Sequence, residues 1–173
     1  MNKDLFLLLK PTTMKKLILA LSVVFLSYIG LSQNQYTTTI VTCNNENQTN
    51  PTDWVSYIDN EVFKIDYKFI DCDPDMGFDF ETVILKIQNK TSTIIDIDWF
   101  IDMYYNDVCR TCDHPIEYSR TIQLAPNEII EGTCDRNTNQ QLKLFSKFID
   151  AAYTNRSRLT GFQLNTLTTT TVD

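Results

Sequence analysis

The chain has 173 residues, of which 43% are hydrophobic, 12% aromatic and 21% charged, with 15 basic and 22 acidic side chains. The aromatic content excludes a disordered chain, and only four glycines and five prolines exclude a collagenous or low-complexity one. The acidic balance argues against nucleic acid and anionic lipid as partners, because like charges repel.

The first 32 residues are predicted to be an N-terminal extension followed by a secretory signal peptide. Residues 14–16 are a short basic region and residues 17–31 are mostly apolar. The small residues Gly30 and Ser32 stand before a cleavage point at Gln33. The apolar stretch has about 15 residues, whereas roughly 20 are needed to span a bilayer. We therefore expect cleavage, and no membrane span in the mature form.

Residues 33–173 are predicted to form one domain, which is long enough to bury a single core. Residues 1–32 carry four of the basic and one of the acidic side chains, so 11 positive and 21 negative charges remain, a net charge of −10. Translation from Met14 instead of Met1 would leave this domain unchanged. The predicted location is secreted or periplasmic.

Short alternating segments predict the strands of an all-β domain. Residues 36–43 are rich in β-branched side chains and are predicted to be the first strand, followed by a polar loop over residues 44–53. Apolar side chains alternate with polar ones over residues 63–69, which predicts a second strand. Residues 83–87 and 95–105 alternate on either side of a turn and are predicted to form a β-hairpin.

The second strand of this hairpin has one apolar and one polar side. Trp99 shares the apolar side with Ile97 and Ile101, so it is predicted to be buried. The polar side carries three carboxylates, those of Asp96, Asp98 and Asp102. They could meet a basic partner or pair with Lys86 across the hairpin, although such carboxylates more often only keep a strand soluble.

The C-terminal half continues the same pattern. Residues 116–124 predict a fifth strand, and a turn at residues 125–128 leads to a sixth over residues 129–134. Residues 142–149 fit both a strand and a helical stripe. We expect a strand, with the threonine-rich residues 159–172 as its antiparallel partner. Seven or eight short strands without a long helix indicate an antiparallel β-sandwich.

Several of these segments also resemble a known family of domains. Residues 83–91, the alternating strand after them, the Leu-Ala-Pro-Asn-Glu run at residues 124–128 and a late strand resemble the immunoglobulin-like sandwich domains of exported bacterial proteins. In particular, the chain is similar to small uncharacterised secreted proteins of Bacteroidota. The resemblance implies an immunoglobulin-like fold and export, and it brings no catalytic residues. The Cys, Trp and Tyr-x-Cys spacing of true immunoglobulin domains is absent around Trp99.

Four of the five cysteines could serve in a haem-attachment motif, a redox-active dithiol, a zinc site or disulfides. The Cys109-Arg-Thr-Cys112 motif lacks the histidine that must follow directly for haem attachment, and it lies in a loop instead of at the helix N-terminus typical of a thioredoxin-like dithiol. A structural zinc ion would need four ligands. The chain offers Cys72, Cys109, Cys112 and Cys134. In the oxidising environment of an exported protein, however, disulfides among these four are the expected state.

The expected strand directions predict which cysteines form disulfides. If consecutive strands alternate in direction, Cys43 lies at one end of the sandwich and the other four cysteines at the opposite end, which makes Cys43 the odd thiol. Bridges from the Cys109 and Cys112 loop to Cys72 and to Cys134 close longer loops than a bridge within the motif, and longer loops constrain the unfolded chain more. These longer bridges are the predicted pairs.

An acidic segment resembles a calcium loop, because carboxylates at alternating positions can converge on one hard cation. Its candidate ligands are Asp71, Asp73, Asp75, Asp79 and Glu81. Relative to an EF-hand the glycine comes one residue late, Thr82 stands at the twelfth position and flanking helices are missing. The alternative is a solvated acidic loop.

No arrangement of residues predicts an enzyme. His114 is the only histidine, and it lies in a loop beside a proline. Three glycosylation sequons, at Asn47, Asn89 and Asn155, are expected to be unmodified after a signal peptide of bacterial form. We expect an exported, monomeric, non-enzymatic binding or structural module for a protein or glycan ligand, with calcium as the one cofactor it could hold. The alternatives are a metal-stabilised extracellular domain and an envelope-associated adhesive protein.

Overall fold

The computed structural model describes residues 33–43, 50–72, 79–135, 137–149 and 157–172. These residues form antiparallel β-strands and one short 3-10 turn, without an α-helix among them. The described residues from Gln33 onward form one compact unit. The prediction of an all-β, antiparallel chain is therefore confirmed.

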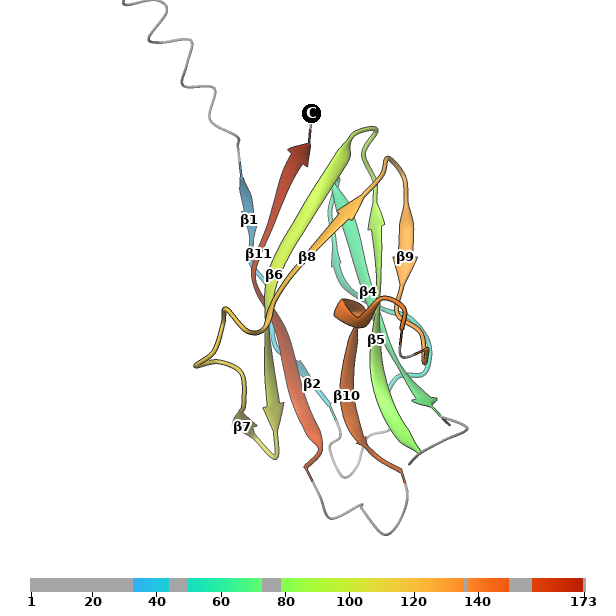
Figure 1. Ribbon diagram of the computed structural model, residues 1–173, viewed down its shortest axis with the longest axis vertical. Coiled ribbons are helices and arrows are strands. Elements are labelled where there is room, and N and C mark those ends of the chain that lie inside the picture. Colours follow the sequence, from blue (N-terminus) through green and yellow to red (C-terminus); the bar gives the residue numbers. More distant parts are fainter. Residues whose placement is uncertain (1–32, 44–49, 73–78, 136, 150–156, 173) are drawn as a thin grey trace, which may run out of the picture. The chain divides into compact units, whose positions relative to one another are not determined.

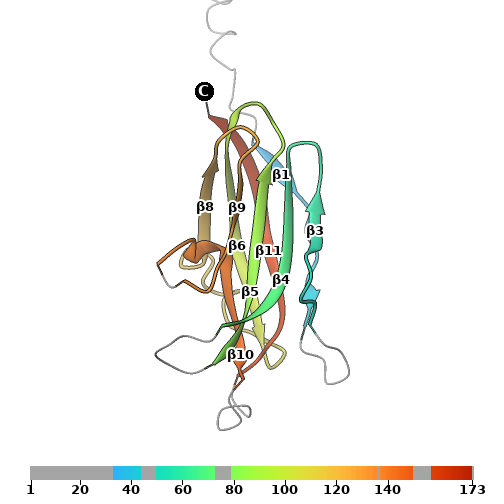
Figure 2. The same ribbon diagram turned by 90° about the vertical axis from the view of Figure 1, so that its right-hand side faces the viewer.

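The strands belong to two sheets, which Figure 1 shows as two layers. The six-stranded sheet consists of β1 (Asn34–Tyr36), β2 (Val41–Thr42), β6 (Ile94–Tyr105), β7 (Val108–Cys109), β8 (Ser119–Leu124) and β11 (Leu159–Val172). The five-stranded sheet, seen face on in Figure 2, consists of β3 (Val55–Asp59), β4 (Phe63–Cys72), β5 (Phe80–Asn89), β9 (Ile129–Glu131) and β10 (Lys143–Phe148). The 3-10 turn η1 (Gln140–Leu142) directly precedes β10.

One hydrophobic core lies between the layers, and each of the longest strands supplies it with alternate side chains. Trp99 of β6 is 1% exposed, so its predicted burial is confirmed. The fully buried members from both layers include Phe63, Ile65, Leu85, Ile87, Ile95, Ile97, Ile101, Leu124, Leu144 and Phe162. The period of two in these segments places apolar groups on one side of each strand, and burial of that side drives the two sheets together.

The predicted hairpin is wrong, because β5 and β6 belong to different sheets. β5 is hydrogen-bonded to β4, β9 and β10, whereas β6 is hydrogen-bonded to β7, β8 and β11. The turn between them crosses from one layer to the other (Figure 1). Alternation reports which side of a strand is buried and not which strand lies beside it, so a hairpin and a crossover have the same sequence pattern.

Because β5 and β6 lie in different sheets, the predicted pairing of Lys86 with the aspartates of β6 is wrong. This lysine lies in the five-stranded sheet, where its Nζ is 3.4 Å from the carboxylate of Asp66. The three aspartates do share one side of β6, away from the core, but their partners are neutral. Their carboxylates accept hydrogen bonds from Gln123, Thr121 and Asn165, respectively.

Three further differences concern strand partners and limits. The expected strand over residues 36–43 is split into β1 and β2, because the register of β11 shifts between Asn165 and Thr168 and Thr166 has a φ of 52°. β3 is a strand that the sequence pattern did not reveal. β10 is a strand as expected, but it pairs with β5, and β11 pairs with β6.

Asn89 holds the crossover turn closed. Its side chain is fully buried, and Nδ2 donates to the carbonyl oxygens of Thr93, Ala125 and Leu124 at 2.8, 2.9 and 3.3 Å. Its Oδ1 accepts from the backbone and the side chain of Thr91, each at 2.8 Å. The residue thus ties the turn after β5 to the turn after β8.

Replacing Asn89 by Ala should lower the free energy of unfolding by roughly 2 to 3 kcal/mol, because buried carbonyls lose their donor. Urea denaturation measures this loss. The control is Gln88→Ala on the outer side of the same strand, which should change stability by about 0.5 kcal/mol or less. Equal effects of the two substitutions would contradict the role of Asn89.

Candidate functional site

The structure pairs Cys72 with Cys134 and Cys109 with Cys112, and leaves Cys43 as a buried free thiol. The four predicted cysteines are thus all in disulfides, and Cys43 is the odd residue as expected. The predicted pairing between them is wrong. Cys72 and Cys134 meet on the outer side of the five-stranded sheet, whereas Cys109 lies in β7 of the other sheet.

The predicted position of Cys43 at the opposite end from the other cysteines is wrong. The strand β3 was missed, so the direction of each later strand relative to Cys43 was inverted, and β2 and β4 run to the same end (Figure 1). The wrong pairing has another cause, because Cys72 and Cys109 lie in strands of different sheets and a bridge between them would have to pass from one layer to the other. Proximity in space therefore outweighs the entropy gained from a longer loop.

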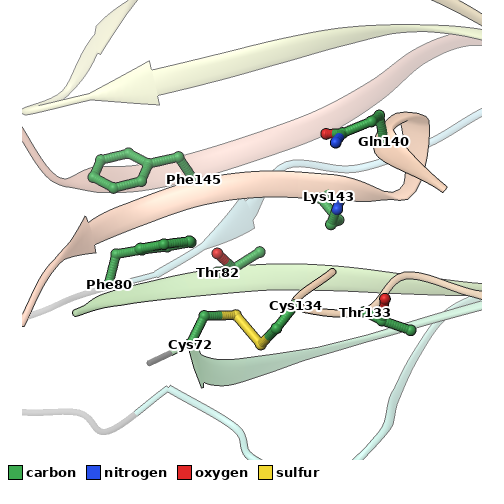
Figure 3. Close-up of a pocket in the computed structure, with 8 residues that line it drawn as sticks. All are labelled: Cys72, Phe80, Thr82, Thr133, Cys134, Gln140, Lys143 and Phe145. Carbon is green, nitrogen blue, oxygen red and sulfur yellow. A yellow bond between two sulfur atoms is a disulfide. The ribbon is translucent and has the colours of Figure 1, made fainter. Parts of the chain in front are cut away.

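A hollow of about 200 Å³ lies on the outer side of the five-stranded sheet. It contains the Cys72–Cys134 disulfide and two phenylalanine rings, as Figure 3 shows. Its lining residues are Cys72, Phe80, Thr82, Thr133, Cys134, Gln140, Lys143 and Phe145.

The hollow exists because the segment between β9 and β10 folds back over the sheet. Gly132 permits this approach, since a Cβ there would lie 2.5 Å from the carbonyl oxygen of Leu142. The Cys72–Cys134 disulfide fastens the segment to the end of β4. As a result, Ile84 is 3% exposed although it points away from the core. The continuous apolar run Val83-Ile84-Leu85 was a sequence signal for such a cover, because a strand with one exposed side would alternate.

Two aromatic rings and the disulfide supply the apolar part of the hollow, and Lys143 adds one cation. The rings of Phe80 and Phe145 lie 6.1 Å apart, and the Phe148 ring packs edge-on against Phe145 at 4.9 Å. The Lys143 ammonium donates a hydrogen bond to the carbonyl oxygen of Asp135. Partial burial lowers the pKa of Lys143, and the negative charge of Asp135 opposes this shift. An anion beside Lys143 would favour the charged ammonium.

Thr82 supplies an unsatisfied polar group to the same hollow. The residue is 3% exposed, and its buried Oγ1 has no hydrogen-bond partner among the described residues. Figure 3 shows its side chain between the Phe80 ring and Lys143. A buried hydroxyl without a partner costs about 1 to 3 kcal/mol.

The outer side of the same sheet also carries a lysine cluster next to Trp54. The ammonium groups of Lys68 and Lys86 lie 4.6 and 4.2 Å from the centre of the Trp54 ring, which is a cation–π arrangement. Asp66, only 4% exposed, is 3.0 Å from Lys64. The aspartates of β6, in contrast, point outwards from the other sheet.

Only part of the predicted calcium loop is described. Asp73 and Asp75 lie outside the described residues, so the ligand set stays a prediction. Glu81 has other partners: its Oε1 accepts from Asn50 at 2.8 Å and Ser146 at 2.7 Å, and its Oε2 is 3.4 Å from Lys147 Nζ. Asp71 is exposed and lies opposite Glu81 in the pairing of β4 with β5. Asp79 directly precedes β5.

Cys43 is shielded from reaction. Its Sγ donates to the carbonyl oxygen of Leu159 at 3.3 Å, and burial, assisted by the nearby charge of Glu81, raises its pKa to about 12. A thiol must lose its proton to act as a nucleophile. Cys43 is therefore a core residue and no candidate for catalysis.

The Cys109–Cys112 loop is anchored to β6 by the threonine inside it. Thr111 is 1% exposed, and its Oγ1 donates to the carbonyl oxygen of Ile101 at 2.7 Å and accepts from the N–H of Met103 at 2.8 Å. Cys112 itself is exposed. The loop thus presents its cysteines to solvent from a fixed position on the six-stranded sheet.

The structure also places His114 and one of the three glycosylation sequons. His114 is exposed, and its backbone N–H donates to the carbonyl oxygen of Thr111 within the loop. The Asn89 amide is buried and hydrogen-bonded, so this sequon is inaccessible in the folded protein. Asn47 and Asn155 lie outside the described residues. Among the residues described here, no helix is long and apolar enough to cross a membrane.

Comparison with known protein families, with curated proteins and with solved structures gives no match. The candidate site therefore depends on geometry alone. Sequence reasoning did not identify the hollow, because its residues come from three strands and one connecting segment that are far apart in the chain.

Proposed function

We propose that the protein is an exported, non-enzymatic binding module with an immunoglobulin-like β-sandwich, and that the hollow beside the Cys72–Cys134 disulfide is its ligand site. The observation that carries this proposal is the hollow itself, which combines aromatic walls, a lysine at the edge and the unpartnered Thr82 hydroxyl. Binding sites are typically apolar cavities with a few convergent polar groups.

Export is supported by the two disulfides, which persist in oxidising compartments, and by the signal-like residues 1–32. The immunoglobulin-like assignment is supported by two antiparallel sheets around one core. The mature protein of this proposal comprises residues 33–173 and acts in the periplasm or outside the cell.

The chemistry of the hollow indicates its ligand. A volume of about 200 Å³ is below the 300 Å³ or more of sites for drug-sized molecules, so it suits one ring or one large side chain. Lys143 favours a ligand whose apolar group carries a negative charge. We propose as ligand a protein segment with an aromatic or aliphatic anchor residue beside a carboxylate, since such anchors supply most of the binding energy at protein interfaces.

Phenylacetate and phenethylamine test this proposal, because both carry a phenyl ring but their charges are opposite. Titration of the purified protein, followed by amide NMR shifts, should show phenylacetate binding at residues 133–145 and little binding of phenethylamine. The variant Lys143→Gln should weaken phenylacetate binding roughly tenfold, because a charged hydrogen bond is lost.

The matched control is Lys68→Gln, which removes a lysine from the same sheet side but outside the hollow. It should leave phenylacetate binding unchanged. Equal binding of the amine and the acid, or shifts located away from the hollow, would contradict the proposed ligand chemistry. An unaltered affinity in Lys143→Gln would contradict the role of that lysine.

A further inference from the structure

Asp102 and the Cys109–Cys112 motif form a cluster that the ligand site does not use. One carboxylate oxygen of Asp102 and the two Sγ atoms all lie within 4.8 Å of one another. In the disulfide, the two sulfurs are bonded to each other and cannot act as thiolate ligands. After reduction, the two cysteines and Asp102 would offer two thiolates and a carboxylate on one side of the six-stranded sheet. We propose that reduction converts this cluster into a site for a thiophilic divalent cation of the zinc type.

The geometry suits such a cation. Zinc binds thiolates at about 2.3 Å and carboxylates at about 2.0 to 2.2 Å in a tetrahedral arrangement, which places two sulfur ligands about 3.8 Å apart. The Cα atoms of the two cysteines are 5.8 Å apart, so rotation of their side chains suffices to reach this separation. Three protein ligands leave a fourth position for water or another donor, and the Tyr104 hydroxyl is 3.9 Å from Cys112 Sγ.

The loop keeps its position when the disulfide opens, because bonds other than the disulfide hold it. Thr111 is buried and joined to β6 by the two hydrogen bonds described above. The N–H of Arg110 donates to the carbonyl oxygen of Met103 at 2.8 Å, and Cys109 pairs with Tyr104 in the β6–β7 ladder. The two thiols therefore stay close together, and the entropy cost of assembling the ligands is small.

Asp102 is also positioned for this role. Asn165 of β11 donates from Nδ2 to Asp102 Oδ2 at 3.0 Å, which orients the carboxylate. Such an outer hydrogen bond is typical of metal-ligating carboxylates, and its loss usually weakens metal binding 10- to 100-fold. The site differs from the four-cysteine zinc centre considered from the sequence, because Cys72 and Cys134 are bridged to each other on the other sheet.

A dithiol is the reductant that opens the Cys109–Cys112 disulfide. The disulfide bond between Cys109 and Cys112 takes up two electrons and two protons, and the dithiol becomes a disulfide. The divalent cation then displaces both thiol protons, so that two thiolates and the Asp102 carboxylate bind it. Cys112 is exposed, which gives the reductant access, whereas Cys43 is buried and contributes no ligand.

Cobalt(II) tests the proposal, because its visible absorption reports tetrahedral coordination and its near-ultraviolet bands report thiolate ligands. The oxidised protein should show neither, and the protein reduced with a dithiol and then freed of it should bind one Co²⁺ with both signatures. Asp102→Asn should weaken this binding by about tenfold or more, and Asn165→Ala by roughly tenfold. Cys109→Ser should abolish the two-thiolate spectrum.

The matched control is Asp98→Asn, which alters a carboxylate on the same side of β6 outside the cluster and should leave Co²⁺ affinity unchanged. Alkylation with mass analysis should modify Cys109 and Cys112 in the reduced protein and leave both unmodified once Co²⁺ is bound. Absence of thiolate–cobalt absorption after reduction, or equal affinity in Asp102→Asn and the parent protein, would overturn the proposal.

Discussion

Replacing Trp99 by Ala should lower the free energy of unfolding by roughly 3 to 5 kcal/mol. The indole is the largest of the fully buried side chains and packs at the centre of β6, between the two layers. Its removal loses the transfer free energy of the ring and leaves a cavity that a close-packed sandwich cannot fill. Urea or thermal denaturation measures the loss.

Two further variants test whether the stability loss comes from burial of the indole ring. Asp98→Ala, on the outer side of the same strand, removes a hydrogen bond from Thr121 and should cost about 1 kcal/mol or less. Trp99→Phe should be milder than Trp99→Ala, because it keeps most of the ring volume and removes an Nε1 that has no partner among the described residues. Equal denaturation midpoints for Trp99→Ala and Asp98→Ala would show that the register of β6 is wrong.

Removal of the Cys72–Cys134 disulfide should lower stability by roughly 4 kcal/mol, whereas removal of the Cys109–Cys112 disulfide should cost only about 2 kcal/mol. The reason is loop length, because the two bridges join residues 62 and 3 positions apart, and the longer loop constrains the unfolded chain more. The comparison uses the double variants Cys72→Ser with Cys134→Ser and Cys109→Ser with Cys112→Ser.

The same pair of variants separates stability from binding. The first should also weaken phenylacetate binding, because the segment that covers the five-stranded sheet loses its attachment to β4. The second should retain phenylacetate binding, since its cysteines lie on the other sheet. Non-reducing peptide mapping of the parent protein should yield a Cys72–Cys134 peptide pair. A peptide that joins Cys109 to Cys72 or Cys134 would contradict both the structure and the expected order of stabilities.

The sequence alone predicted the properties that depend on local pattern. Alternation of apolar and polar side chains located the strands around Phe63, Val83 and Ile97, and it identified the buried side of β6 that carries Trp99. A period of two is a direct consequence of the pleated strand, so it can be read without knowledge of any neighbour. The count of five cysteines similarly required an odd thiol, and Cys43 was correctly selected for that position, although by a strand order that lacked β3.

Only the tertiary structure decided which strands are neighbours. β5 and β6 have the pattern of a hairpin but lie in opposite layers, and β10 pairs with β5 instead of β11. The disulfide pairs and the hollow follow from these choices, since Cys72 and Cys134 meet only because the segment after β9 folds over the outer side of β4 and β5. Such contacts join residues distant in the chain, and their energies depend on packing between whole sheets, which no local periodicity records.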